Sequence, residues 1–201
     1  MQINIDKKTG IFLGIIAALV LVIVGLLVFR DGDHRGMKHD SHVGTMHSNN
    51  SSSLNSVDIM FLQMMIPHHQ QAVDISNLAI SKSKNLELVA LAKGILTAQT
   101  AEIVQMKSWL AAAGAGLDMG HEMHGMSGML SDSELTELNN ATGSTFDQLW
   151  LNGMIAHHDG AIDMTEMLES TKSSEIKAFG ENVIKVQSAE IAQMKALLSK
   201  V

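Results

Sequence analysis

Two twelve-residue segments carry adjacent histidines in nearly the same setting. Residues 65–76 read MIPHHQQAVDIS, and residues 154–165 read MIAHHDGAIDMT. On an α-helix, where successive residues lie 100° apart, both histidines of each pair fall on the apolar side with the methionine that starts the segment. A buried imidazole needs a polar partner, and imidazole beside thioether is a donor set for soft metal ions. Both segments are therefore candidate metal-binding segments.

Two further segments repeat a glutamate and a methionine. Residues 98–110 read AQTAEIVQMKSWL, and residues 186–198 read VQSAEIAQMKALL. A lone carboxylate on the core side of a helix is costly, and a nearby imidazole or metal ion removes that cost. The spacing i, i+3, i+7 puts three side chains on one stripe of each helix: Gln99, Glu102 and Met106 in the first, Gln187, Glu190 and Met194 in the second.

These segments belong to an internal duplication with an offset of 88 to 89 residues. Each repeat holds one helix-length segment with the histidine pair and a second with the glutamate and the methionine. Two helical hairpins of this size cannot each bury a core alone, so we predict a four-helix bundle with pseudo-twofold symmetry. Breaks are expected near 82–85, 114–128 and 170–174. Pro67 predicts a kink or a late start of the first helix.

Residues 118–129, DMGHEMHGMSGM, join the two repeats and contain several methionines and histidines among glycines. Packing does not explain so many thioether and imidazole groups on a glycine-rich loop. Thioethers select Cu(I), and imidazole serves both Cu(I) and Cu(II). Structural zinc sites favour cysteine, which the chain lacks, and calcium and magnesium favour oxygen. Silver, also soft, is equally compatible. The candidate ligands in this segment are Met119, His121, Met123, His124, Met126 and Met129.

The N-terminal part predicts a membrane anchor. Residues 11–29 carry no charge, and at the helical rise of about 1.5 Å per residue they span the hydrocarbon core of a bilayer. A cleaved signal peptide is the alternative, but its apolar region is usually about 7–15 residues long and ends at a small-residue site, which is absent before Arg30. We expect an uncleaved single-pass helix, and the short preceding tail favours export of the C-terminal part.

Composition places the remainder in the all-α class. Of 201 residues, 46% are hydrophobic but only 3% are aromatic, and one is proline. The net charge of −7 argues against nucleic acid as a partner, because phosphate binding needs a basic surface.

The sequence predicts four parts: a tail (1–10), the transmembrane anchor (11–29), a flexible His/Met/Ser-rich tether (30–56) and a bundle domain (57–201). The bundle domain is divided into a repeat (57–116), a Met/His-rich loop (117–131) and a second repeat (132–201).

Residues 57–201 resemble the domain-of-unknown-function family 305, through MIPHHQQAVDIS, MIAHHDGAIDMT and the paired QTAEIVQMK and QSAEIAQMK. Described members include periplasmic copper-binding proteins of the CopM type, so the resemblance implies a ferritin-like helical bundle that binds copper in a bacterial periplasm or at a cell surface. It also implies a methionine six residues after the histidine pair. Met164 fills that position, whereas the first repeat has Ile75 and its site is expected to be the weaker one. Carried over by position, the copper ligands are Met65, His68, His69 and Met106 in the first repeat and Met154, His157, His158, Met164 and Met194 in the second.

Three functions compete on this basis. The first is a membrane-anchored extracytoplasmic protein, not an enzyme, that binds copper and exchanges it with a copper-exporting or copper-accepting protein; Glu102 and Glu190 are ligands or orient an imidazole. The second is a ferritin-like di-iron redox enzyme, but such sites use two ExxH motifs and the sequence has none. The third is a structural or interaction module, in which histidines and glutamates form a buried network that fixes helix register.

Overall fold

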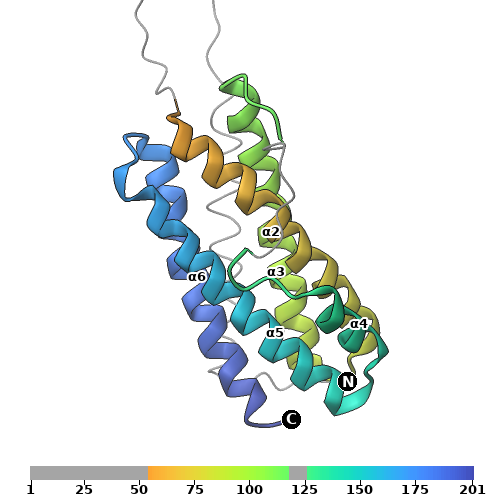
Figure 1. Ribbon diagram of the computed structural model, residues 1–201. Coiled ribbons are helices and arrows are strands. Elements are labelled where there is room, and N and C mark those ends of the chain that lie inside the picture. The colour runs from red at the N-terminus through yellow and green to blue at the C-terminus, as the bar shows by residue number, and fades with distance from the viewer. Residues whose placement is uncertain (1–53, 118–125) are drawn as a thin grey trace, which may run out of the picture. The chain divides into compact units, whose positions relative to one another are not determined.

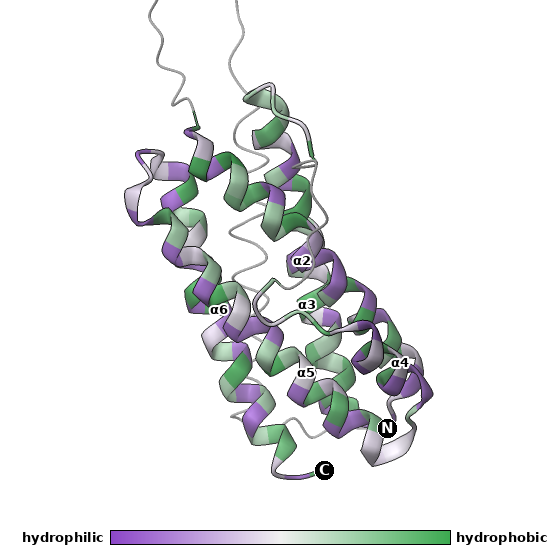
Figure 2. Ribbon diagram, in the orientation of Figure 1, coloured by the Kyte–Doolittle hydropathy of each residue, from purple (hydrophilic) through white to green (hydrophobic). Residues whose placement is uncertain are grey.

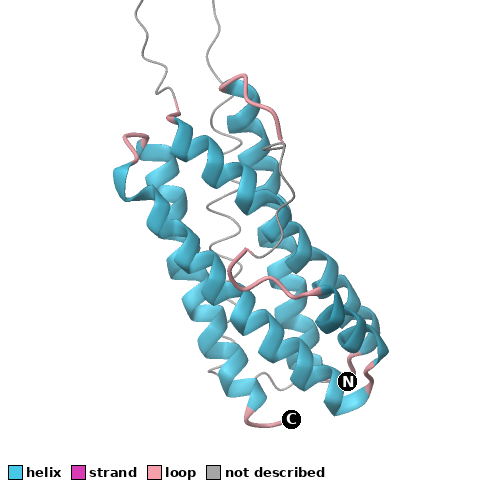
Figure 3. Cartoon of the chain, in the orientation of Figure 1, coloured by secondary structure: helices cyan, strands magenta, loops and turns pink. Residues whose placement is uncertain are grey.

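The computed structural model describes residues 54–117 and 126–201, which form helices joined by short connections (Figures 1 and 3). Four long helices form a bundle: α2 (Ser56–Lys82), α3 (Leu86–Ala112), α5 (Gly143–Met164) and α6 (Ser174–Leu198). A short helix, α4 (Asp132–Asn140), precedes α5, and a 3-10 turn, η1 (Thr165–Ser170), follows it. No strand occurs in these residues, so the all-α prediction is confirmed.

The predicted N-terminal tail, anchor and most of the tether fall outside the described residues. Within residues 54–117 and 126–201, no helix combines the length and the apolar character needed to cross a bilayer.

Side-chain caps explain where the helices begin. The Asn55 side chain accepts hydrogen bonds from the backbone N–H of Val57 (2.7 Å) and of Asp58 (2.9 Å), and Asp58 accepts one in return from the Asn55 N–H (3.0 Å). Asn85 caps α3 and Ser173 caps α6 in a similar way. Such caps satisfy amide donors that have no partner inside the helix. The connections at 83–85 and 171–173 match two of the predicted breaks.

Two local features differ from the sequence-based expectation. Helix α2 begins at Ser56 and continues through Pro67, so of the two alternatives for this proline the late start is wrong and the kink stays a prediction. Helix α4 was not expected as a separate element. It has its own capping box, in which Ser131 and Glu134 bond each other's backbone N–H groups, and Gly143 at φ 59° then redirects the chain into α5.

The core consists of two apolar clusters, each with residues from all four long helices, so neither hairpin buries a core by itself. Figure 2 shows apolar and polar residues alternating along every long helix, as expected of helices that bury one face. The Phe61 cluster contains Phe61, Leu62, Met65, Ile66, Ile103, Met106, Leu110, Ala161, Met164, Leu168, Ile176, Phe179 and Val183. The Trp150 cluster contains Ala72, Ile75, Ala79, Leu88, Leu91, Ala92, Ile95, Leu130, Leu138, Phe146, Trp150, Leu151, Met154, Ile191, Met194 and Leu197.

A layer of buried polar side chains separates the two clusters. Each long helix contributes two side chains to this layer, and on each helix the core residues before them belong to one cluster and those after them to the other. A bundle of this size can be closed with apolar residues alone, and buried polar groups cost free energy unless they are paired. The layer therefore needs an explanation other than packing. We call it the polar layer; its members are His68, His69, Gln99, Glu102, His157, His158, Gln187 and Glu190.

Candidate metal centre

Two histidine–glutamate pairs occupy equivalent places in the two repeats. His69 Nε2 lies 2.8 Å from Glu102 Oε2, and His158 Nε2 lies 2.8 Å from Glu190 Oε2. Both imidazoles have no exposed surface, and the glutamates are 5% and 7% exposed. Because a carboxylate only accepts, Nε2 donates in both pairs. The predicted buried glutamates therefore have imidazole partners, one within each hairpin.

The other two histidines, His68 and His157, face each other where α2 and α5 meet. Their ring centroids are 3.8 Å apart and their planes are tilted by 38°. His157 donates from Nε2 to the backbone carbonyl of His68 at 3.0 Å, and His68 donates from Nε2 to the carbonyl of Ser127 at 3.1 Å. Both carbonyls are acceptors only, so Nε2 carries the proton in each ring.

The opposite nitrogen of all four imidazoles, Nδ1, is buried and has no hydrogen-bond partner within residues 54–117 and 126–201. Burial, reinforced by the charge of His69, lowers the pKa of His68 from its ordinary 6.5 to about 4, although the Ser127 carbonyl opposes the shift. Burial, followed by the neighbouring histidines, holds the pKa of His157 well below its ordinary value. A neutral ring that donates through Nε2 presents a lone pair at Nδ1. That is the form in which imidazole binds metals, with an oxygen acceptor fixing the ring from the other side.

Buried methionines lie one helical turn from each histidine–glutamate contact. Four residues before His69 on α2 is Met65, and four residues after Glu102 on α3 is Met106, so the antiparallel hairpin sets these methionine positions opposite each other. The second hairpin repeats this arrangement around His158 and Glu190, with Met154 and Met194. All four methionines have no exposed surface.

The structure changes how the remaining predicted ligand is grouped. Met164 belongs to the Phe61 cluster with Met65 and Met106 of the first repeat, whereas Ile75 belongs to the Trp150 cluster with Met154 and Met194 of the second. The sequence had placed Met164 with the second repeat and Ile75 with the first. The grouping by repeat is therefore revised.

The end of the inter-repeat loop, residues 126–130, forms a strap over this region. The Gln71 side chain donates to the Leu130 carbonyl (2.9 Å) and accepts from the Leu130 N–H (2.8 Å). The strap touches α5 through glycines: a Cβ on Gly160 would lie 2.1 Å from the Ser127 oxygen, and one on Gly128 would lie 2.3 Å from the Ala156 oxygen. This close approach puts the Ser127 carbonyl within reach of His68.

The strap holds two of the six predicted loop ligands. Met126 is half-buried against the Phe61 cluster, and Met129 is half-buried as well. Met119, His121, Met123 and His124 lie outside the described residues.

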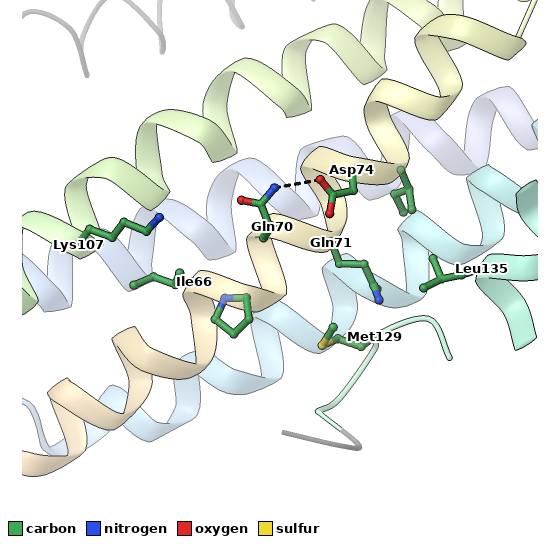
Figure 4. A pocket seen from close by; sticks show the side chains of 9 residues that line it. Ile66, Gln70, Gln71, Asp74, Lys107, Met129 and Leu135 are labelled. Carbon is green, nitrogen blue, oxygen red and sulfur yellow. Dashed lines mark hydrogen bonds between the residues drawn. The ribbon is translucent and has the colours of Figure 1, made fainter. Parts of the chain in front are cut away.

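Met129 also lines a surface hollow of about 480 Å³ beside α2 (Figure 4). Gln70 donates to Asp74 at 2.9 Å on this surface, and Pro67 and Lys107 contribute to the lining. None of the four histidines lines the hollow, so it is separate from the polar layer.

Three further polar groups in or near the layer have no partner among the described residues. Both amide atoms of Gln99, Oε1 of Gln187 and Oγ of Ser76 are buried there without a hydrogen bond. The sequence had placed both glutamines on the core stripes, three residues before the glutamates, but had not assigned them to the site. The Ser127 carbonyl was missed because a backbone acceptor leaves no residue-type signal.

The available donors fit a soft ion. Within residues 54–117 and 126–201, no three His, Asp or Glu side chains come together as a metal-binding group. A metal held here would therefore take methionine sulfur beside imidazole nitrogen, and this mixed set suits Cu(I) and Ag(I). The unpartnered Nδ1 atoms and the buried thioethers one turn away satisfy that requirement.

The chain matches a known protein family. Residues 58–198 match the family described as Domain of unknown function (DUF305). The chain belongs to the DUF305 family. No curated protein gives a significant match.

Several solved structures are similar to the chain. A DUF305 fragment from Deinococcus radiodurans is 26% identical, with a TM-score of 0.69 over 74% of this chain and 99% of that one. A DUF305 protein from Streptomyces coelicolor, described as secreted, is 26% identical, with a TM-score of 0.68 over 72% and 93%. CopM in its Cu(I)-bound form is 32% identical, with a TM-score of 0.60 over 71% and 96%. CopM has also been crystallised with Cu(II) and with silver.

Proposed function

We propose that this DUF305 protein is a membrane-anchored, extracytoplasmic copper-binding protein that buffers copper or hands it to an exporting or accepting partner. One observation carries the proposal. Four fully buried imidazoles are each fixed through Nε2 by an oxygen acceptor, while each Nδ1 has no partner in the part of the chain that the structure describes. A purely structural network has no reason to leave all four equivalent nitrogens unpaired, because each costs free energy.

In this proposal copper is cargo, held by imidazole nitrogen and thioether sulfur. Glu102 and Glu190 hold the rings of His69 and His158 in place, as outer carboxylates do for metal-bound histidines. The methionines and histidines of residues 118–129 and of the tether would capture copper ions near the bundle. The sequence predicts this bundle to be ferritin-like. The bundle ligands are His68, His69, His157, His158, Met65, Met106, Met154, Met164 and Met194.

The relatives support the copper assignment and the exported location. CopM, at about a third identity, has been crystallised with Cu(I), Cu(II) and silver, and the Streptomyces coelicolor relative is described as secreted. The anchor at residues 11–29 rests on the sequence alone.

Metal loading of the full chain in detergent tests the proposal. The chain is stripped of metal, titrated with Cu(I) in the presence of a competing chelator and separately with Cu(II), and its copper content is measured. The titration is repeated on a variant in which residues 118–125 are replaced by glycine and serine. We expect the variant to keep tightly bound copper in the bundle. A wild-type chain that retains no Cu(I) would contradict the proposal.

A four-histidine variant, with His68, His69, His157 and His158 replaced by glutamine, separates the remaining functions. Loss of bundle-bound copper is expected. Lower stability with unchanged copper binding would instead support a structural network, and iron-dependent oxygen consumption by the wild type would support a redox enzyme.

A further inference from the structure

Two hydrogen bonds define the register of α2 against α5. Trp150 Nε1 donates to the Ile75 carbonyl at 3.0 Å, and seven residues along each helix His157 donates to the His68 carbonyl at 3.0 Å. Seven residues further, the same antiparallel register reaches Phe61 on α2 and Met164 on α5. Both belong to the Phe61 cluster, so the register and the packing agree.

This register, combined with the one inside each hairpin, makes the two halves of the core unequal. In the Phe61 cluster, Met164 joins Met65 and Met106, which lie opposite each other one turn beyond the His69–Glu102 contact. In the Trp150 cluster, the place equivalent to Met164 is taken by Ile75. The Phe61 cluster thus contains three buried methionines and the Trp150 cluster contains two. The half-buried Met64 and Met126 also pack against the Phe61 cluster, from its edge.

We infer that Met65, Met106 and Met164 form one three-thioether site for a soft monovalent ion, built from both repeats, and that Ile75 makes the Trp150 half a weaker site with two thioethers. This inference rests on the proposed function and specifies where it resides. It reverses the order that the sequence suggested, because the missing methionine of the first repeat weakens the site of the second.

Chemistry and burial support this assignment. The three sulfur-bearing side chains are 0%, 0% and 6% exposed and lie among Phe61, Leu62 and other apolar residues. Thioethers are neutral and soft, so in an apolar setting they suit a singly charged soft ion better than a divalent one, whose burial costs more. His69 lies four residues from Met65 on the same face of α2, and its Nδ1 has no partner among the residues that the structure describes. An imidazole is thus available beside the thioethers.

Methyl NMR with silver tests the inference residue by residue. The full chain in detergent is labelled with ¹³C at the methionine ε-methyl groups, assigned by single Met→Leu variants, and titrated with Ag(I), a diamagnetic analogue of Cu(I). We expect the methyl signals of Met65, Met106 and Met164 to change together at the lowest silver levels. Those of Met154 and Met194 should change only as more silver is added. The site-specific signals keep loop methionines from obscuring the result.

Two reciprocal exchanges complete the design. Met164→Ile gives the Phe61 cluster the isoleucine that the Trp150 cluster has at the equivalent place. It should lower the silver affinity of the site that fills first by about tenfold or more, since loss of a supporting group alone typically costs 10–100-fold in metal affinity. Ile75→Met should bring Met154 and Met194 to the low silver range. Met60→Leu, at a 39% exposed position of α2 outside both clusters, is the matched control and should change neither site.

The outcomes separate this inference from the proposed function. If no core methionine signal responds to silver, and copper is not retained either, the proposed function fails. If both groups respond at the same silver level, or Met164→Ile weakens the Met154 and Met194 group instead, copper binding stands and the three-thioether site is contradicted. Should Met164→Ile not fold, Met164→Leu and the gain expected for Ile75→Met decide.

Discussion

His157 donates a hydrogen bond from Nε2 to the backbone carbonyl of His68 across the α2–α5 interface, and the two rings lie 3.8 Å apart. This contact joins the repeats at the centre of the polar layer. By pseudo-symmetry His68 would donate to the His157 carbonyl, yet it donates to Ser127 in the strap instead. The inter-repeat loop thus takes the place of one symmetric contact, and its fixed end lies directly against a proposed copper ligand.

The first prediction concerns the stability of the metal-free protein in acid. A lowered pKa means that the folded state keeps His68 neutral while the unfolded chain takes up a proton below about pH 6.5. The stabilising contribution is complete above 6.5 and falls as the pH drops toward 4, by on the order of 3 kcal/mol for His68. Urea unfolding at pH 7, 6, 5 and 4 measures it. The His68→Gln variant keeps an N–H donor for Ser127 and should make the unfolding free energy less dependent on pH. An equally steep pH dependence in this variant would show that His68 is not its source.

The second prediction concerns the carboxylates behind His69 and His158. Glu190→Gln keeps the size and an acceptor for the imidazole but removes the charge, so Cu(I) affinity of the bundle should fall about 10–100-fold. Glu102→Gln should act similarly. Chelator competition measures the affinity, and Glu181→Gln, an exposed position on the same helix as Glu190, is the control that should bind as the wild type does. Equal affinities for Glu190→Gln and Glu181→Gln would show that the buried carboxylate has no part in binding.

The third prediction concerns the strap. Gly160→Ala would place a Cβ 2.1 Å from the Ser127 oxygen, a backbone atom that cannot move aside without displacing the strap. We expect a loss of about 1–3 kcal/mol in unfolding free energy, despite alanine's better helix propensity. Hydrogen exchange at the Leu130 amide, which Gln71 protects, should speed up.

Gly153→Ala on the same helix is the matched control for the strap. Its Cβ would meet only the end of the Leu130 side chain at 3.1 Å, which can adjust. We expect a change within about 1 kcal/mol of wild type. If Gly153→Ala destabilises the protein as much as Gly160→Ala does, close backbone packing of the strap is not the cause.

Much of the fold and of the site could be predicted from the sequence because it depends on local periodicity. Helical spacing placed His69 and Glu102 on buried faces, and the duplication indicated that His158 and Glu190 would repeat the pair; both pairs form at 2.8 Å. The grouping of Met164 could not be predicted, because it depends on the register between helices of different repeats. The same holds for the Ser127 carbonyl, which acts through backbone geometry, and for α4, whose short capping box lies in a segment interpreted as part of a repeat.

Long-range ¹H–¹⁵N NMR of the histidine rings, recorded on the full chain at pH 7 before and after Ag(I) addition, tests a copper centre in the polar layer most directly. Before addition, we expect the tautomer with the proton on Nε2 and none on Nδ1 for His68, His69, His157 and His158, because each Nε2 lies against an oxygen acceptor. After addition, Nδ1 signals of these rings should move while Nε2 stays protonated. Silver that binds the bundle with all four Nδ1 signals unchanged, or Nδ1 atoms protonated in the metal-free protein, would contradict a copper centre in the polar layer.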